Sequence, residues 1–149
     1  MSEYNKLIND INNRKFLPIY LIHGQENYFS DKIIKHLVSI VINEDSVDFD
    51  LKKIYGKKSD ENQESEVIDF IKRFPLSGDY NLVVVKDSKN LSNDFNNIIS
   101  YLENLNSKSI LVLAFNENID KRKKIYKSSQ KNGVVFESKQ IYENQVYKW

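Results

Sequence analysis

Apolar residues recur at the spacing of one helix face in four segments of the chain, which are 4–11, 28–42, 66–74 and 95–105. Positions i, i+3, i+4 and i+7 share a face of a helix, so each segment would bury one side and expose the other. A fifth segment, 121–130, is strongly charged and turns only Ile125 and Tyr126 inward, and Gly133 follows it at a position typical of a helix cap. The pattern predicts five helices.

Short apolar runs separate these helices. The strands that we expect are Pro18–His23, 47–55, 81–86, 109–115 and one that begins at Val134. The run Leu82–Val85 is continuous, as in a strand that is buried on both faces of a parallel sheet. Alternation of strands and helices predicts an α/β fold, with a five-stranded, mostly parallel sheet and helices on both faces. We expect residues 1–149 to form this single domain, and the abrupt end suggests a domain cut from a longer chain.

Composition removes several functional classes. The 149 residues include 22 basic and 21 acidic side chains, so the net charge of +1 gives no general argument for nucleic-acid binding. Cysteine is absent, which excludes disulfides, thiolate metal sites and cysteine nucleophiles. No apolar run approaches the roughly 20 residues of a membrane span, and the N-terminus has no signal-peptide pattern. We expect a soluble, cytoplasmic protein without a membrane partner.

The stretch after the first predicted strand resembles a phosphate-binding loop in position but not in residues. A P-loop has the pattern G-x-x-x-x-G-K-[ST], in which glycines, a lysine and a hydroxyl hold phosphates and Mg²⁺. Here Gly24 is followed by Gln25, Glu26 and Asn27, without a second glycine or a Lys-Ser/Thr pair. Glu26 would place negative charge where phosphate should lie. These four residues are therefore predicted to form a degenerate P-loop.

Other candidate chemistry is sparse. Lys86 and Asp87 end a predicted central strand, where a Walker B acid would hold a metal, but without a phosphate site we expect a solvated strand end. His23 and His36 have no ligand at metal-binding spacing and are expected to be partly exposed. The basic block at 121–124 is expected to be a solvated helix face rather than a nucleic-acid contact. We predict no catalytic residue, metal or cofactor.

The turn after residues 66–74 can be interpreted in two ways. Pro75 ends the helix and fixes the backbone, so Leu76 projects from the turn. An apolar side chain presented in this way can anchor in the pocket of a partner. Alternatively, Leu76 folds back and covers the junction between helix and strand. Spacing alone favours the second interpretation.

Two separated stretches together resemble a known family. LPIYLIHGQENYFSDKII is similar to the opening of the delta subunit of the bacterial DNA polymerase III clamp loader, with matches at Pro18, Tyr20, Leu21, Gly24 and Glu26. RFPLSGDYNLVVVKDSKNL resembles the helix end, proline turn and valine-rich strand of that family. The closing IYENQVYKW resembles the passage into the second domain of the family. The resemblance covers the first of three domains.

The resemblance implies an AAA+-type, P-loop NTPase-like three-layer fold that does not hydrolyse ATP. A delta subunit binds the ring-shaped beta sliding clamp and opens it for loading onto DNA during replication. It is not an enzyme by itself but a subunit of DNA polymerase III. Its other partners are the remaining clamp-loader subunits, which it meets mainly through later domains absent here, and DNA, which it meets indirectly.

In that family a helix followed by an apolar pair enters a hydrophobic pocket of the clamp. The pair falls on Leu76 and Ser77, and the accompanying residues that we assign to clamp binding are Ile71, Phe74 and Pro75. Leu76 fits the pattern, whereas Ser77 departs from it because the family usually has a large apolar residue there. Either Phe74 compensates or the contact is weaker. Two alternatives stay open, namely a degenerate P-loop domain that still binds nucleotide and a flavodoxin-like interaction domain.

Overall fold

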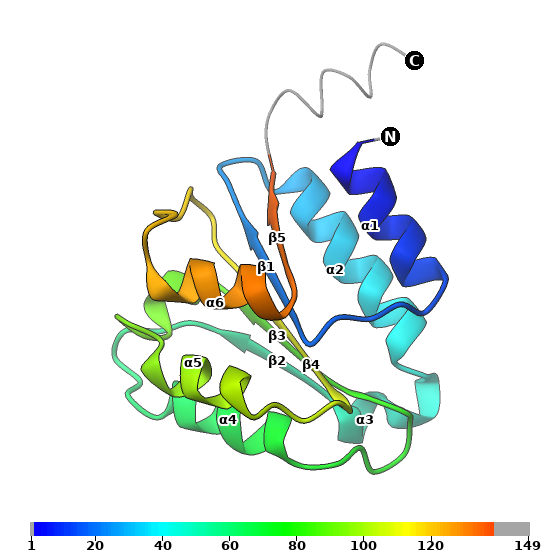
Figure 1. Cartoon of the computed structure of the whole chain (residues 1–149). Coiled ribbons are helices and arrows are strands. Elements are labelled where there is room, and N and C mark those ends of the chain that lie inside the picture. The colour runs from blue at the N-terminus through cyan, green and yellow to red at the C-terminus, as the bar shows by residue number, and fades with distance from the viewer. Residues whose placement is uncertain (1, 139–149) are drawn as a thin grey trace.

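A parallel β-sheet forms the centre of the computed structural model, which describes residues 2–138 (Figure 1). Its strands are β1 (Ile19–His23), β2 (Leu51–Tyr55), β3 (Asn81–Lys86), β4 (Ser109–Ala114) and β5 (Val134–Glu137). Their order is β2-β3-β4-β1-β5, and every pair of neighbours is parallel. The predicted five-stranded α/β fold is confirmed for this part of the chain.

Helices cover both faces of the sheet (Figure 1). The helices α1 (Glu3–Asn12) and α2 (Tyr28–Val41) pack on one face. The other face is covered by α4 (Gln63–Lys72), α5 (Asn96–Glu103) and α6 (Lys124–Asn132). Within residues 2–138, no helix combines the length and the apolar character that a bilayer span requires.

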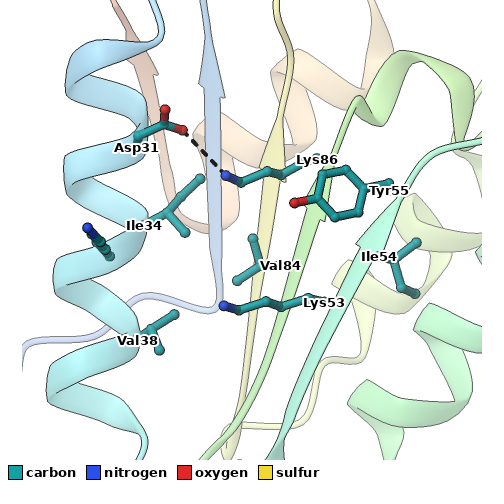
Figure 2. Close-up of a pocket in the computed structure, with 9 residues that line it drawn as sticks. Asp31, Ile34, Val38, Lys53, Ile54, Tyr55, Val84 and Lys86 are labelled. Atoms are coloured by element: carbon teal, nitrogen blue, oxygen red, sulfur yellow. Dashed lines mark hydrogen bonds and ion pairs between the residues drawn. The ribbon is translucent and has the colours of Figure 1, made fainter.

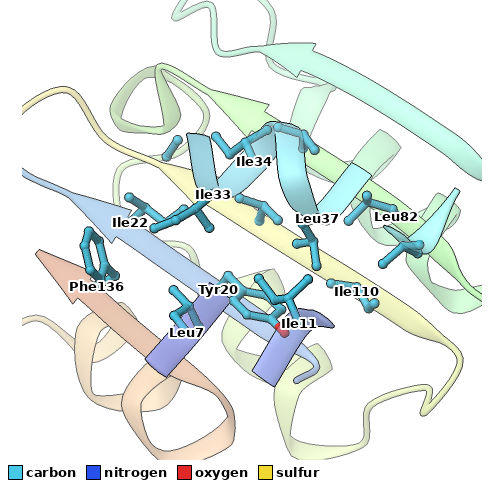
Figure 3. Packing of buried hydrophobic residues seen from close by; sticks show 14 of the residues in the cluster. Leu7, Ile11, Tyr20, Ile22, Ile33, Ile34, Leu37, Leu82, Ile110 and Phe136 are labelled. Carbon is cyan, nitrogen blue, oxygen red and sulfur yellow. The ribbon is translucent and has the colours of Figure 1, made fainter. Parts of the chain in front are cut away.

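Strand β1 contributes to both hydrophobic cores. Its residues are all buried and alternate between the faces, as the period of two in a strand requires. Tyr20 and Ile22 face α1 and α2, where they join Ile33 and Leu37 of α2 (Figure 3). Ile19 and Leu21 of the same strand pack with α4, α5 and α6. Burial on both faces explains why this segment of the sequence is continuously apolar.

Of the strand predicted over 47–55, only the part from Leu51 to Tyr55 is confirmed, and the prediction for residues 47–50 is wrong. A 3-10 turn (Glu44–Ser46) and the short helix α3 (Val47–Asp50) precede β2, which begins only at Leu51. Asn43 and Ser46 form a reciprocal capping box that starts the helical turn. The alternating apolar residues Val47 and Phe49 are exposed rather than directed into the core. The apolar residues at 47 and 49 alternate as in a strand, but they are not buried, and the strand was therefore predicted too long at its start.

The cap predicted at Gly133 is confirmed, but for a different physical reason. Its φ of −160° is extended, not left-handed. A Cβ at this position would lie 2.0 Å from the carbonyl oxygen of Ile19, so glycine allows α6 to approach β1 closely. Helix α6 begins at Lys124, three residues later than expected. The predictions for 141–149 lie outside the described residues.

Candidate functional site

The loop after β1, at the carboxyl edge of the sheet, contains the four residues that were predicted to form a degenerate P-loop. Gly24 has φ +127°, and a Cβ there would lie 2.2 Å from the carbonyl oxygen of Ser138. Its N–H donates to the carbonyl of Glu117 at 3.2 Å. Glycine at this position is therefore required by close packing of three chain segments.

Glu26 supplies an internal anion at the start of α2. Its carboxylate accepts a hydrogen bond from the N–H of Tyr28 at 3.0 Å. In a P-loop, phosphate oxygens accept from the N–H groups at this helix terminus. Gln25 and Asn27 are exposed, and the side chain of Asn27 does not cap α2. The carboxylate of Glu26 therefore lies at the start of α2, where a P-loop would hold phosphate.

His23 was expected to be partly exposed, and this prediction is wrong. His23 is the last residue of β1 and is 2% exposed, because the loop after β4 and Tyr126 of α6 cover its side chain. Its Nδ1 accepts a hydrogen bond from the N–H of Ile119 at 3.1 Å. Burial lowers its pKa from the ordinary value, which favours the neutral imidazole that this acceptor role requires. His23 thus ties the end of β1 to the loop after β4.

The end of β3 holds no metal-binding cluster. Lys86 Nζ lies 3.5 Å from the Asp31 carboxylate, and the Asp87 carboxylate accepts a hydrogen bond from the Asn116 amide. Among residues 2–138, no three His, Cys, Asp or Glu side chains are grouped so that they could hold a metal ion. The Walker B position therefore consists of a lysine and an aspartate that have partners within the protein.

A groove of about 360 Å³ lies between α2 and the strands β2 and β3 (Figure 2). Lys53 and Lys86 project into it over a floor that includes Val84, and Asp31 and Ile34 line the α2 side. The pairing of Lys86 with Asp31 neutralises part of its positive charge. Sequence patterns gave no sign of this groove, because its lining comes from three separate segments.

The turn after α4 lies at the opposite, amino edge of the sheet and is held by a buried carboxylate. Asp50, at the end of α3, has 0% exposure. Its Oδ1 accepts from the N–H of Leu76 at 2.7 Å, and its Oδ2 accepts from those of Ser77 and Gly78 at 3.0 and 2.6 Å. Successive N–H groups that converge on one anion in this way fix the path of residues 76–78.

The charge state of Asp50 follows from these contacts. Burial alone would raise its pKa, because it disfavours the charged form. The hydrogen bonds from the three N–H groups, aided by the nearby Arg73 guanidinium, outweigh burial and lower the pKa below its usual value. The group that holds the turn is therefore an ionised carboxylate at neutral pH.

The end of α4 is fixed by polar side chains from three elements. The guanidinium of Arg73 donates to the carbonyl of Phe49 at 2.6 Å and stacks over the ring of Phe70 at 4.1 Å. The carbonyl of Arg73 in turn accepts from the amides of Asn81 at 2.5 Å and Asn106 at 3.0 Å. These bonds satisfy the helix terminus before Pro75.

Leu76 points away from the core, so the interpretation that spacing favoured is wrong. Its side chain is 67% exposed, and that of Phe74 is 71% exposed. Ser77 is also exposed, and Pro75 is half-buried. Ile71 has 0% exposure and packs in the core, so it is not part of this surface. The structure brings Phe74, Leu76 and Ser77 together on one exposed turn.

The basic block at 121–124 is only partly helical. Residues 121–123 precede α6, and the Arg122 guanidinium pairs with the Asp120 carboxylate at 2.9 Å. Hydrogen bonds from Arg122 hold the pKa of Asp120 at about 2. One cation of the block therefore has an internal partner.

Two residues of the site were missed from the sequence. Alternation assigned Phe49 and Asp50 to a strand, so the sequence did not indicate that either residue lies beside the turn after α4. A carboxylate 26 positions before Leu76 carries no local signal of contact with it. Only the pairing of β2 with β3 places the segments that precede these strands side by side.

Comparison with known proteins gives a consistent result. The family described as "DNA polymerase III, delta subunit" matches residues 20–139. DNA polymerase III subunit delta of Bacillus subtilis is 24% identical over 134 residues, which cover 83% of this chain and 38% of that protein. This chain therefore spans less than half the length of that relative.

Two solved structures share the fold. The DNA clamp loader delta protein of Bacillus subtilis aligns with a TM-score of 0.77 at 21% identity, over 91% of this chain and 42% of that one. A DNA polymerase III gamma subunit-related protein of Thermotoga maritima aligns with a TM-score of 0.59 at 14% identity, over 93% and 46% of the two chains. Since the family match covers most of the sequence, the chain belongs to the DNA polymerase III delta subunit family.

Proposed function

We propose that this chain is the clamp-binding domain of a clamp-loader delta subunit. On this proposal it binds the beta sliding clamp through the exposed turn at Phe74–Ser77, and Leu76 is the central anchor. The observation that carries the proposal is the 67% exposure of Leu76 on a turn whose N–H groups are held by the buried Asp50. A preorganised apolar side chain loses little conformational freedom on binding.

The free energy gained by burying Leu76 is large enough for this side chain to dominate the contact. Complete burial of a leucine side chain contributes roughly 1.5–3 kcal/mol, and an apolar anchor in a well-fitted pocket often dominates an interface. Phe74 is close in sequence and equally exposed, so it can add apolar contact area. Pro75 sets the backbone between them.

The action of the domain on the clamp is proposed to be mechanical. A ligand shifts a conformational equilibrium only by its difference in affinity for the two states. Tighter binding of the turn to an open or strained clamp interface would therefore favour ring opening for loading onto DNA. On this proposal the domain hydrolyses no ATP, and the other loader subunits, reached through later domains, supply that activity.

The test is the substitution Leu76→Asp. Because a charged carboxylate is costly to bury in an apolar pocket, we expect affinity for the cognate clamp to fall by roughly a hundredfold or more. Calorimetric titration of the clamp with the purified protein measures the affinity. Circular dichroism and thermal unfolding establish that the variant stays folded, which the exposure of Leu76 leads us to expect.

The matched control is Tyr55→Asp. Tyr55 is 57% exposed and ends β2 at the opposite edge of the sheet, so its substitution should leave clamp affinity unchanged. Wild-type affinity in a folded Leu76→Asp variant would overturn the assignment of the site. No binding of clamp by the wild-type protein would overturn the proposed function itself.

A further inference from the structure

Exposed large apolar side chains are concentrated at one place on the described part of the chain. Seven such residues are exposed, and four of them, Val47, Phe49, Phe74 and Leu76, belong to α3 and the turn after α4. Figure 1 shows α3 beside the connection from α4 to β3. We call these four side chains the two-segment surface. Isolated exposed apolar residues are common, but a group on adjoining segments indicates an interaction site.

Polar contacts fasten the two segments to each other. The carboxylate of Asp50, which follows Phe49 directly, accepts the N–H of Leu76 at 2.7 Å. From the other side, Arg73 donates to the carbonyl of Phe49 at 2.6 Å. The hydroxyl of Ser77 lies 3.4 Å from the carbonyl oxygen of Asp45, at the start of the same helical turn. These hydrogen bonds hold together the backbones that carry Phe49 and Leu76.

We propose that Phe49 supplies the second apolar contact of the clamp-binding site. The inference rests on the proposed function, and it assigns to α3 the role that Ser77 cannot fill with its small polar side chain. Leu76 enters the pocket of the clamp, and Phe49 packs beside it on the same partner. Phe49 is 52% exposed, so a large part of an aromatic ring is available for burial. Aromatic residues are over-represented among the side chains that dominate interfaces.

The surroundings indicate the chemistry of the partner surface. Glu44, Asp45 and Asp48 are exposed around α3, and none of them forms an ion pair within residues 2–138. Arg73 lies at the same junction, so the border contains three carboxylates and one guanidinium. An apolar centre whose border carries this excess of negative charge fits an apolar pocket that is bordered by lysine or arginine. Because Phe49 and Leu76 are joined through Asp50, the occupant of the two-segment surface is the sliding clamp that the turn contacts.

The experiment is calorimetric titration of the cognate clamp with wild-type protein, three Phe49 variants, one control variant and Leu76→Asp. Phe49→Ala and Phe49→Lys should weaken binding by roughly tenfold or more, whereas Phe49→Leu should keep most of the affinity. Tyr55→Ala removes an equally exposed aromatic ring at the far edge of the sheet and should change affinity by less than about twofold. Urea unfolding of each variant separates lost contact from lost structure.

The outcomes distinguish this inference from the proposed function. If Leu76→Asp abolishes binding while folded Phe49→Ala and Phe49→Lys bind as the wild type does, the role of Phe49 is overturned and the proposed function stands. If the wild-type protein does not bind the clamp, the proposed function fails. A loss of affinity in both folded Phe49 variants, with recovery in Phe49→Leu, supports direct apolar contact by this side chain.

Discussion

Asp50 has no exposed surface, and three backbone N–H groups of the turn satisfy its two carboxylate oxygens. A buried charge is tolerated only when it is paired and hydrogen-bonded, and here the bonds also determine where Leu76 points. Arg73 adds a favourable charge at the same junction. Asp50 thus both stabilises the turn and fixes the position of the surface that is proposed to bind the clamp.

Replacing Asp50 with asparagine should reduce the free energy of unfolding by roughly 1–3 kcal/mol near neutral pH, because the amide NH₂ faces N–H donors. The folded-state pKa of Asp50 lies below its ordinary value of 3.8. Its contribution to stability is therefore fully present above the ordinary pKa and is lost as the pH falls through the folded pKa. Urea unfolding at several pH values measures the difference from the wild type, which should narrow in acid.

Asp48→Asn is the matched control, since it makes the same chemical change two residues earlier at an exposed side chain. Its unfolding free energy should stay within about 0.5 kcal/mol of the wild-type value. An Asp50→Asn protein as stable as the wild type near neutral pH would show that the carboxylate does not hold the turn.

The unit of β1, the following loop and α2 has the strand-loop-helix order of a P-loop without the residues that hold phosphate. Gly24 serves the close approach of Ser138, and the carboxylate of Glu26 accepts at the start of α2. Gly24 and Glu26 therefore contact protein atoms at a place where a P-loop would contact phosphate. Repulsion between Glu26 and a phosphate group disfavours an anion at this position.

Mg-ATP should therefore give no binding heat at concentrations up to about a millimolar, because the element lacks the lysine and hydroxyl that hold a triphosphate. Isothermal titration of the purified protein measures this directly. A functional P-loop ATPase titrated with the same solutions serves as the positive control. Saturable micromolar binding would return the degenerate P-loop to consideration as a nucleotide site.

Across the whole molecule, the degenerate P-loop and the two-segment surface lie at opposite edges of the sheet (Figure 1). The loop after β1 is at the carboxyl edge, whereas α3 and the turn after α4 precede β2 and β3 at the amino edge. The parallel sheet therefore separates the two positions. Strand β2 lies at the border of this sheet and supports α3.

Native-state hydrogen exchange should reflect this arrangement. Strand β4 is buried along its whole length and pairs with β3 and β1, whereas β2 pairs only with β3. Amides of β4 should exchange roughly tenfold or more slowly than those of β2 and α3, because local opening of an edge element disrupts fewer contacts. Nuclear magnetic resonance or mass spectrometry resolves the segments. Equal protection of β2 and β4 would contradict a sheet whose stability declines toward β2.

The sequence was sufficient for the features that depend on local periodicity. Apolar runs and helix faces identified the strands and the principal helices, because burial on one or both faces imposes its period on neighbouring residues. The absence of the P-loop pattern after β1 could be read from the sequence for the same reason, since Gly24 to Asn27 are contiguous. The family resemblance, carried by two such contiguous stretches, was confirmed by the match over residues 20–139.

Features that depend on contacts between distant segments required the folded structure. Residues 47–50 alternate like a strand but form a helix, because the capping box at Asn43 and the bonds of Asp50 to residues 76–78 outweigh their local preference. The direction of Leu76 was decided by the same carboxylate. Such a contact joins positions 26 residues apart and leaves no periodic trace in the chain, so tertiary packing alone revealed the surface that Phe49 and Leu76 form.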